Sequence, residues 1–225
     1  MSVNLISYSQ PASPVEGLED IQDLVAFCAR VSNPTNQMNS ATSEKLLNYL
    51  IKHRHWSPFE MVSVCLEIVT TRDIGRQLLR HRSFSFQEFS QRYADPLAGN
   101  SGLEFQIREC RLQDIKNRQN SISIEEADIE NKYIALQWER KQKELINWVE
   151  EQYRWALNNG IAKEQARVIL PEGLTSSRIY VNGTLRSWIH YIELRSANGT
   201  QLEHQQIAME CAKIIAKIYP AINPT

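Results

Sequence analysis

A strict alternation of apolar and polar residues marks positions 61–70, MVSVCLEIVT. Val62, Val64, Leu66 and Ile68 would lie on one side of an extended chain, which predicts a strand with one buried face. Shorter apolar stretches predict three further strands, at residues 3–9, 105–110 and 177–183.

Most of the remaining chain places apolar residues at helical spacing. In residues 21–32, for example, Ile21, Leu24, Val25 and Cys28 recur as they would on one face of a helix. The strands are scattered among such helices without a regular strand–helix–strand rhythm, so the pattern favours an α+β fold over a doubly wound sheet. The same spacing predicts further helices at 42–54, 72–82, 125–159, 163–170, 185–197 and 202–219.

The composition is that of an ordinary globular protein, with 225 residues of which 42% are hydrophobic and 23% are charged. This length suits one domain spanning residues 1–225. The formal net charge is −1, whereas non-specific binding to nucleic acid needs an excess of Lys and Arg. We therefore expect no nucleic-acid partner and interpret local basic clusters as pockets for small anions.

The sequence also contains no recognisable metal-binding or membrane-spanning pattern. The four cysteines form no CxxC pair, so no zinc or redox motif is indicated and no metal is expected. No stretch approaches the roughly 18 apolar residues of a membrane span, and the N-terminal residues do not resemble a signal peptide. We therefore expect a cytoplasmic protein with reduced thiols and no membrane partner.

Residues 80–93, RHRSFSFQEFSQRY, combine three arginines, a histidine and four aromatic residues with a single acid, Glu88. Guanidinium groups bind phosphates through paired hydrogen bonds. If Arg80 and Arg82 end a helix they point in different directions, because neighbouring helical residues lie about 100° apart, and one cluster could serve two ligands. Composition alone slightly favours a surface loop with chance arginines and buried aromatics.

The spacing within this segment matches a known signature. Arg80-His81-Arg82, then seven residues, then Ser90 followed by x-Arg-Tyr resembles the signature of the flavin-dependent thymidylate synthases. Other segments resemble that family in the same order: KHRHWSPFE (52–60), RQLLRHR (76–82), ARVILP (166–171) and LRSWIHYIELR (185–195).

The resemblance implies a fold, an assembly and a reaction. The fold would be α+β, with a central antiparallel sheet packed with helices, assembled as a homotetramer whose active sites combine several subunits. The reaction would be the reductive methylation of dUMP to dTMP. In it 5,10-methylenetetrahydrofolate donates the carbon, FAD mediates the redox step and NADPH reduces the flavin. The chain has no GxGxxG turn, so a Rossmann-type FAD site is not expected.

The resemblance also assigns residues to two ligands. The five tryptophans are expected to be core and subunit contacts, although Trp56 and Trp188 lie near flavin-linked segments and either could border the flavin ring. The positions that match dUMP contacts of the family are Gln77, Leu78, Leu79, Arg80, Glu88, Phe89, Ser90, Gln91, Arg92, Arg167 and Arg195. The positions that match FAD contacts are His55, Ser57, Arg80, His81, Arg82, Glu88, Thr184, Leu185, Arg186 and His190.

Arg195 is the predicted catalytic residue, because it matches the arginine of the family that helps to ionise N3 of the uracil. Loss of the N3 proton increases electron density at C5, and a nearby guanidinium stabilises the resulting anion. Arginine stays cationic, so it acts as an electrostatic partner and not as a base. This route needs no cysteine nucleophile, and none of the cysteines has an evident activating neighbour in the sequence.

Three positions depart from the family pattern. Gln87 stands where Asn is usual, Gly199 where many members have His, and Met61 where His is frequent. None of the three lies in the Arg-His-Arg segment or at Arg195, so we expect activity to be retained.

One alternative function remains open at the level of sequence. The Arg/Phe cluster could belong to a module that binds single-stranded nucleic acid or nucleotides, which would show strongly salt-dependent binding. His53 and His55 form an HxH pair, but no cysteine or carboxylate completes a metal site beside them. We expect Glu60 to pair with a nearby arginine and not to take part in catalysis.

Overall fold

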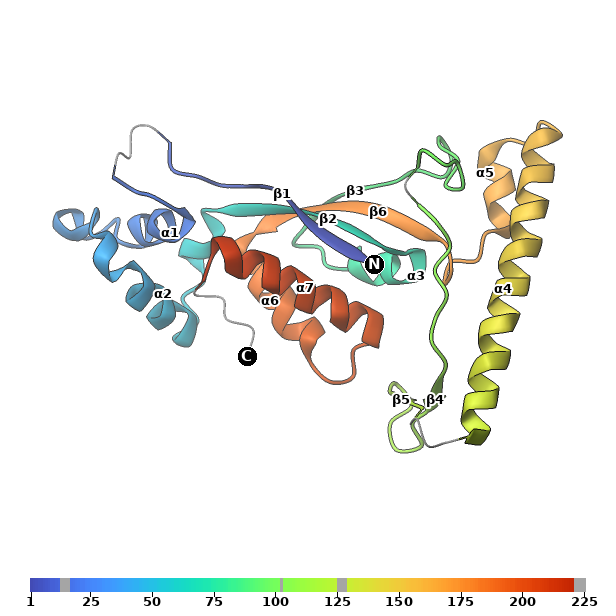
Figure 1. Cartoon of the computed structure of the whole chain (residues 1–225). Coiled ribbons are helices and arrows are strands. Elements are labelled where there is room, and N and C mark those ends of the chain that lie inside the picture. The colour runs from blue at the N-terminus through green and yellow to red at the C-terminus, as the bar shows by residue number, and fades with distance from the viewer. Residues whose placement is uncertain (13–16, 102, 125–128, 221–225) are drawn as a thin grey trace.

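The fold is built on one four-stranded antiparallel sheet, seen in a computed structural model that describes residues 1–12, 17–101, 103–124 and 129–220. The strand order is β1-β2-β6-β3, and all neighbouring strands are antiparallel. Figure 1 shows the sheet at the centre, with helices below it and at both ends. The strands are β1 (Ser2–Tyr8), β2 (Ser63–Thr71), β3 (Ser85–Glu88) and β6 (Ser176–Thr184).

The predicted alternation in β2 is confirmed. Val64, Leu66 and Ile68 are fully buried, and the residues between them are only half-buried. Across the sheet, Leu66 pairs with Val181 and Ile68 with Ile179 of β6. Apolar side chains on one face of two adjacent strands therefore form the centre of the core.

Two helices cover this face of the sheet, α6 (Leu185–Ser196) and α7 (Leu202–Ile218). Trp188 of α6 is fully buried and its indole N–H donates to the carbonyl of Val64, with an Nε1–O distance of 3.0 Å. A buried indole needs such an acceptor, so this bond fixes α6 against β2. The first residue of α6 follows β6 directly, which places the start of α6 at one end of the sheet.

The helices at that end are α1 (Ile21–Ala29) and α2 (Ser43–Lys52). Asp20 caps α1 by accepting hydrogen bonds from the backbone N–H groups of Gln22 and Asp23, which satisfies donors that the first helical turn leaves free. The short 3-10 turns η2 (Pro34–Asn36) and η3 (Ser40–Thr42) lie between α1 and α2, and η4 (Ser57–Glu60) links α2 to β2.

Two predicted helices are shorter than expected. The helix predicted at 72–82 is α3 (Arg72–Leu78), and after it the chain makes tighter turns in which His81 N–H donates to Leu78 and Phe84 N–H to His81. Burial of Phe84 in the core draws the chain away from the helix axis. The helix predicted at 163–170 is divided into α5 (Lys163–Ala166) and η5 (Arg167–Ile169).

The strand predicted at 105–110 is wrong. Only Phe105 forms a single bridge, to Thr175. The backbone of Arg108 pairs instead with the side chain of Gln142, whose Oε1 accepts from the Arg108 N–H and whose Nε2 donates to the Arg108 carbonyl, both at 2.8 Å. Strand β3 and a small hairpin of β4 (Arg111–Gln113) and β5 (Ser121–Ser123) are present but were not predicted.

The long helix α4 (Ile129–Asn158) stands at the opposite end of the sheet from α1 and α2 (Figure 1). It agrees with the helix predicted at 125–159, of which residues 125–128 lie outside the described part. The helix ends at Asn158, and Gly160 follows with φ of 77°, a conformation that favours glycine. Its C-terminal half packs on α5 through a second core cluster: Val149, Tyr153, Ala156, Ala166 and Leu170.

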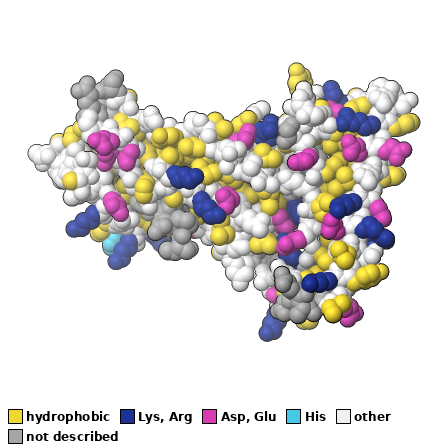
Figure 2. Space-filling view, viewed as in Figure 1, with side chains coloured by type: hydrophobic (Ala, Val, Ile, Leu, Met, Phe, Trp, Pro, Cys, Tyr) yellow, Lys and Arg dark blue, Asp and Glu magenta, His cyan; other side chains and the backbone are white. Residues whose placement is uncertain are grey.

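The rest of α4 exposes many apolar side chains. Leu136 is 65% exposed and Trp148 is 56% exposed, and Figure 2 shows hydrophobic side chains along this part of the surface. The predicted fold class is confirmed: the chain is α+β, with an antiparallel sheet packed against helices. The rest of the described chain leaves these apolar side chains of α4 largely uncovered.

Candidate active site

The turn after α3 exposes both arginines of the Arg-His-Arg segment. Arg80 and Arg82 are both exposed, and neither forms an ion pair among the residues that the structure describes. Because α3 ends at Leu78, the two arginines are separated by a turn and not by a helical rotation. An exposed guanidinium without an acidic neighbour is suited to bind an anion such as a phosphate.

His81, between these arginines, contacts the predicted catalytic residue directly. Nε of Arg195 donates to Nε2 of His81 over 2.9 Å. The Arg195 side chain can only donate, so Nε2 of His81 must be unprotonated. Burial, reinforced by the charge of Arg195, lowers the pKa of His81 to about 4. His81 is therefore neutral near pH 7 and orients the Arg195 guanidinium.

Gln77, the last but one residue of α3, lies in the same region. Its Nε2 donates to Oε1 of Gln201 at 2.8 Å, and its Oε1 lies 3.2 Å from Nδ1 of His204. Gln201 and His204 are not among the residues predicted from the sequence. The signal for His204 was its place on the buried face of α7, in register with Ile207 and Cys211.

Glu88, at the end of β3, is already held by the protein. Its Oε1 accepts from Arg72 at 3.3 Å and from the hydroxyl of Ser177 at 2.9 Å, and Arg76 lies 3.8 Å from its Oε2. The carboxylate is thus neutralised by two arginines. Glu88 can still border a ligand, but its contacts with Arg72, Arg76 and Ser177 already join α3 to the sheet.

The loop after β3 contains the other predicted nucleotide contacts. The Phe89 N–H donates to the carbonyl of Arg178, which continues the sheet beyond β3. Gln91 is buried, and its Nε2 has no hydrogen-bond partner among the described residues. Arg92 pairs with Glu164 of α5 at 3.3 Å, but both side chains are about half exposed or more, so a phosphate can compete with this pair. Arg167 lies just after α5 and is half-buried.

A second group of predicted residues gathers where β6 meets α6. Thr184 caps α6, its hydroxyl accepting from the Ser187 N–H. Arg186 forms an ion pair with Glu60 of η4, which confirms the expectation that Glu60 pairs with an arginine. The exposed ring of His190 packs edge-on against Trp56, with ring centroids 4.7 Å apart. Ser57 follows Trp56 at the start of η4, and the exposed His55 immediately precedes Trp56.

The loop that follows Glu88 and the group of residues at the start of α6 lie at opposite ends of β6. Glu88 contacts Ser177 near the start of this strand, whereas Thr184 is its last residue. Seven residues of extended chain span about 23 Å at 3.3 Å per residue. One protomer therefore does not bring the whole predicted site together, since the loop that follows Glu88 and the Thr184 region are separated by the length of the strand.

Three predicted contacts are constrained by burial. Leu78 and Leu185 have no exposed surface, so in this protomer only their backbone could meet a ligand. Trp188 is buried and hydrogen-bonded to Val64, so the suggestion that it borders the flavin ring is wrong. Trp56, half-buried beside His190, remains as a candidate.

Close packing also fixes the chain beside the Arg-His-Arg turn. A Cβ added to Gly183 of β6 would lie 2.2 Å from a ring carbon of Phe84, so only glycine allows this approach. The hydroxyl of Ser187 donates to the carbonyl of Ser83 at 3.3 Å. These contacts join the turn to the start of α6.

Two of the departures from the family pattern have a structural outcome. Gly199, in the loop between α6 and α7, has φ of 91°. A side chain is strained in this conformation, so the loop geometry itself suits glycine and not histidine. Gln87 is exposed on β3, opposite Tyr180 of β6, where a longer amide is accommodated without displacing the strand.

The cysteines do not form an alternative catalytic centre. Burial raises the thiol pKa of Cys28, Cys65 and Cys211, which disfavours the nucleophilic thiolate. Within residues 1–12, 17–101, 103–124 and 129–220, no three His, Cys, Asp or Glu side chains lie close enough to hold a metal ion. No helix in these ranges is both long and apolar enough to cross a membrane.

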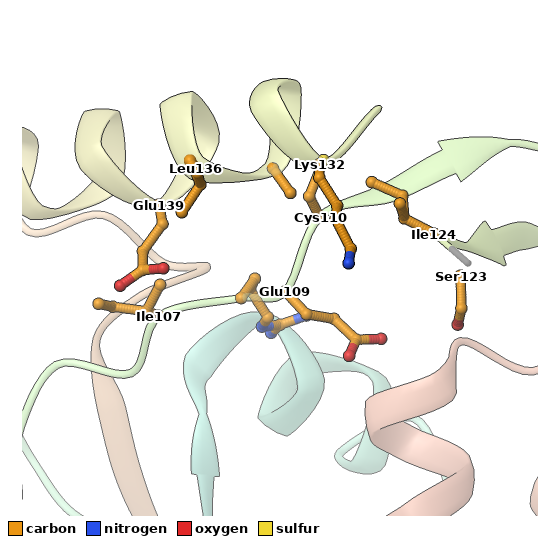
Figure 3. Close-up of a pocket in the computed structure, with 10 residues that line it drawn as sticks. Ile107, Glu109, Cys110, Ser123, Ile124, Lys132, Leu136 and Glu139 are labelled. Atoms are coloured by element: carbon orange, nitrogen blue, oxygen red, sulfur yellow. The ribbon is translucent and has the colours of Figure 1, made fainter. Parts of the chain in front are cut away.

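A cavity of about 630 Å³ lies apart from all of these predicted residues. Figure 3 shows Lys132, Leu136 and Glu139 of α4 on one side of it, and Ile107 and Glu109 of the extended segment on the other. Charges of both signs and apolar groups share its walls. It contains none of the residues assigned to a ligand and is not the candidate active site.

The donors of the chain fit a flavin dinucleotide. Arg80 and Arg82 form no ion pair in the described structure, so their guanidinium groups can bind a pyrophosphate. Trp56 and His190 present aromatic surface near Arg186. The fold and these groups define the class as an α+β protein that binds phosphorylated, ring-containing ligands.

Comparison with known proteins identifies the family within this class. The family described as "Thymidylate synthase complementing protein" matches residues 15–221. A probable flavin-dependent thymidylate synthase of Paramecium bursaria Chlorella virus 1 is 47% identical, covering 99% of this chain and 97% of the relative. A flavin-dependent thymidylate synthase of Synechocystis is 43% identical over the same shares. The chain belongs to the family of flavin-dependent thymidylate synthases.

A solved structure agrees with this assignment. The UMP/dUMP methylase PolB of Streptomyces cacaoi, bound to 5-Br dUMP, superimposes with a TM-score of 0.77 at 25% identity. The match covers 98% of this chain and 92% of that one. The same enzyme bound to 5-Br UMP gives a TM-score of 0.74.

Proposed function

We propose that this chain converts dUMP to dTMP by reductive methylation, with 5,10-methylenetetrahydrofolate as carbon donor, FAD as redox mediator and NADPH as reductant. The observation that carries the proposal is the Arg-His-Arg turn, in which two exposed arginines flank a neutral histidine bound to Arg195. Membership of the family makes the chain a flavin-dependent thymidylate synthase, and the dUMP analogue bound by PolB supports dUMP as the substrate.

Arg195 stabilises the negative charge that develops on the uracil. His81 accepts from Nε of Arg195, which leaves the two terminal nitrogens of the guanidinium without a partner in the described chain. Those N–H groups can meet the anionic N3 or a neighbouring ring oxygen. A fixed cation at that point favours the N3 anion and with it the nucleophilic C5. Because His81 is neutral, its Nε2 can accept from Arg195 and hold the guanidinium in place.

The flavin supplies the electrons that reduce the transferred carbon to a methyl group. The chain's part is to bind and orient it. We assign the exposed arginines Arg80 and Arg82 to its phosphates, and Thr184, Arg186 and His190 to its remaining contacts. Ser57 and His55 would complete this surface from the neighbouring turn.

We propose that the active unit is a homotetramer. Two observations support it: the predicted residues lie in two groups about 23 Å apart along β6, and α4 exposes a large apolar surface. An obligate interface is rich in apolar surface of this kind. Association would bring the Glu88–Arg92 loop of one protomer to the Thr184 region of another.

Introducing charge on the apolar surface of α4 tests the assembly. Leu136→Glu combined with Trp148→Glu should lower the mass measured by light scattering and release FAD at the same protein concentration. Lys141→Glu, at another exposed position on α4, is the matched control and should leave both unchanged. A wild-type protein that is monomeric yet fully active would contradict the proposal.

One incubation tests the reaction itself. The purified protein with dUMP, methylenetetrahydrofolate and NADPH should form dTMP only when FAD is present. Formation of dTMP without any bound flavin, or no product with all components, would refute the function. Tight oligonucleotide binding that weakens steeply with salt would instead favour a nucleic-acid module.

We further propose that residues 1–225 form one domain located in the cytoplasm. The family match over residues 15–221 supports a single unit. All four cysteines are free in the structure, as a reducing compartment requires.

A further inference from the structure

A buried carboxylate anchors a chain of hydrogen bonds that ends at Gln77. Glu203 of α7 is 5% exposed. Its Oε1 accepts from Nη2 of Arg111 at 2.6 Å, and its Oε2 lies 3.1 Å from Nη1 of Arg108. Burial opposes ionisation, but Arg111 and Arg108 outweigh it and lower the pKa of Glu203. Glu203 is therefore an ionised acceptor with no proton to donate.

The anchor determines the direction of the next hydrogen bond. Nε2 of Gln201 lies 3.0 Å from Oε2 of Glu203. Only the amide nitrogen of Gln201 can donate to a carboxylate, so its oxygen must face away from Glu203. That oxygen, Oε1, lies 2.8 Å from Nε2 of Gln77. Gln77 must therefore donate to Gln201.

The same reasoning continues to His204. Because Nε2 of Gln77 faces Gln201, its Oε1 faces Nδ1 of His204, 3.2 Å away. An amide oxygen only accepts, so Nδ1 of His204 carries the proton. The amide of Gln77 is thus held at both ends, and a rotation by 180° would set oxygen against oxygen and N–H against N–H.

His204 cannot reverse this order by taking a second proton. It is fully buried, and its Nε2 has no partner among the residues described. A proton there would be a buried donor without an acceptor, in a neighbourhood that already contains Arg195 and His81. Burial, followed by those two neighbours, lowers the pKa of His204 to about 3. His204 stays neutral with a bare Nε2.

We propose that Gln201 and His204 make the site select uracil over cytosine, by holding the amide of Gln77 in one orientation. This inference rests on the proposed function, in which Gln77 borders dUMP. After the two fixed bonds, Gln77 retains one N–H and one lone pair for a ligand. Both residues are positioning residues, because they act on the base through Gln77.

Uracil and cytosine differ at the edge that the amide of Gln77 would contact. Position 4 of uracil carries an oxygen acceptor and N3 carries a proton, whereas cytosine has an amino donor and a bare N3. An amide that can rotate pairs equally well with either edge by exchanging its oxygen and nitrogen. An amide of fixed polarity pairs with one edge and meets like groups on the other. The Gln77 N–H then meets the carbonyl oxygen at position 4 of uracil.

Equilibrium dialysis of the FAD-loaded protein against dUMP and dCMP tests the inference. The ratio of the two dissociation constants measures base selection. Gln201→Met removes the acceptor for Gln77 at nearly constant shape, and Gln201 is only partly buried, so this variant should fold. His204→Leu removes the other fixed bond, while His204→Asn can return a donor near the place of Nδ1. Gln206→Met, at an exposed position of α7, is the matched control.

We expect Gln201→Met and His204→Leu to lower the preference for dUMP over dCMP by about tenfold, the effect of one lost base-reading pair. His204→Asn should recover most of the preference of the wild type, and Gln206→Met should keep it. The inference is overturned if the ratio in Gln201→Met stays within about twofold of the wild type. An equal loss of both nucleotides would also overturn it, because it would show a merely structural role.

Failure of this inference differs from failure of the proposed function. If the wild type forms no dTMP, the function is wrong whatever the variants do. If the wild type forms dTMP but Gln201→Met selects uracil as strongly, only the role of the network is wrong.

Discussion

The chain places its arginines in two different environments. Arg108 and Arg111 are only 17% and 13% exposed, and both meet the carboxylate of Glu203. Arg80 and Arg82 are exposed, and the described chain offers neither of them an acidic partner. A guanidinium that becomes buried on folding needs a carboxylate partner in the folded chain. An exposed guanidinium keeps its hydrogen-bond donors for a ligand.

This difference separates stability from binding. Replacing an arginine of the first kind should change the free energy of unfolding, and replacing one of the second kind should change ligand affinity. Arg195 stands between the two, because one of its nitrogens is held by His81 and the others are not. It should therefore affect catalysis with little effect on folding.

The largest effect is expected at Arg195. Arg195→Ala should retain FAD and lose about 10²–10³-fold in the rate of dTMP formation, as when one fixed donor to a developing anion is removed. The absorbance of bound flavin and a single-turnover assay measure the two properties. His81→Asn serves as a comparison, because it weakens the positioning of Arg195 and leaves the cation. Turnover unchanged in Arg195→Ala would show that this residue is not the electrostatic partner.

The next effect concerns the buried group. Arg111→Met should lower the free energy of unfolding by about 2–3 kcal/mol, because it removes charged hydrogen bonds to Glu203 and Glu109. Denaturant titration measures this change. Arg140→Met, in an exposed pair with Glu144 on α4, is the control and should change it little. Equal changes in the two variants would erase the distinction between the environments.

A weaker effect is expected for an exposed arginine. Arg82→Gln should leave the unfolding free energy unchanged and weaken FAD binding by about tenfold, the loss of one charge-assisted hydrogen bond. Titration of the apoprotein with FAD measures the affinity. Arg118→Gln, another exposed arginine outside the cluster, should bind FAD as the wild type does. Loss of stability without loss of affinity in Arg82→Gln would contradict the assignment.

Glu203 should make part of the stability depend on pH. Its pKa lies below the ordinary value of 4.5, so the unfolded state takes up the proton first. The contribution of Glu203 is complete above about pH 4.5 and is lost as the pH falls through the lowered pKa. Unfolding measured from pH 7 to pH 3 should therefore show a smaller loss of stability in Glu203→Gln than in the wild type. Parallel curves would mean that its pKa is the same folded and unfolded.

The smallest effect is expected at the exposed pair of Arg92 and Glu164, whose side chains are 66% and 48% exposed. Glu164→Gln should change the unfolding free energy by less than about 0.5 kcal/mol, because water screens the pair. If Arg92 binds the nucleotide phosphate, freeing it should leave dUMP affinity equal or raise it. A clear fall in affinity, measured by dialysis, would show that the pair positions Arg92.

The sequence by itself determined the features that depend on near neighbours. The alternation in residues 61–70 identified β2, helical spacing identified α1, α4, α6 and α7, and the Arg-His-Arg spacing indicated the family. These signals are local, because the period of a strand or helix and the residues of a short motif are present in one stretch of chain.

The tertiary structure decided what depends on distant partners. Gln142 of α4 binds the backbone at Arg108 and prevents the strand predicted there, while burial of Phe84 ends α3 early. Likewise, Gln77 meets Gln201 across 124 residues of chain. A polar side chain forms its hydrogen bond with whichever group the fold brings close enough. The periodicity of the sequence carries no information about which distant groups will meet.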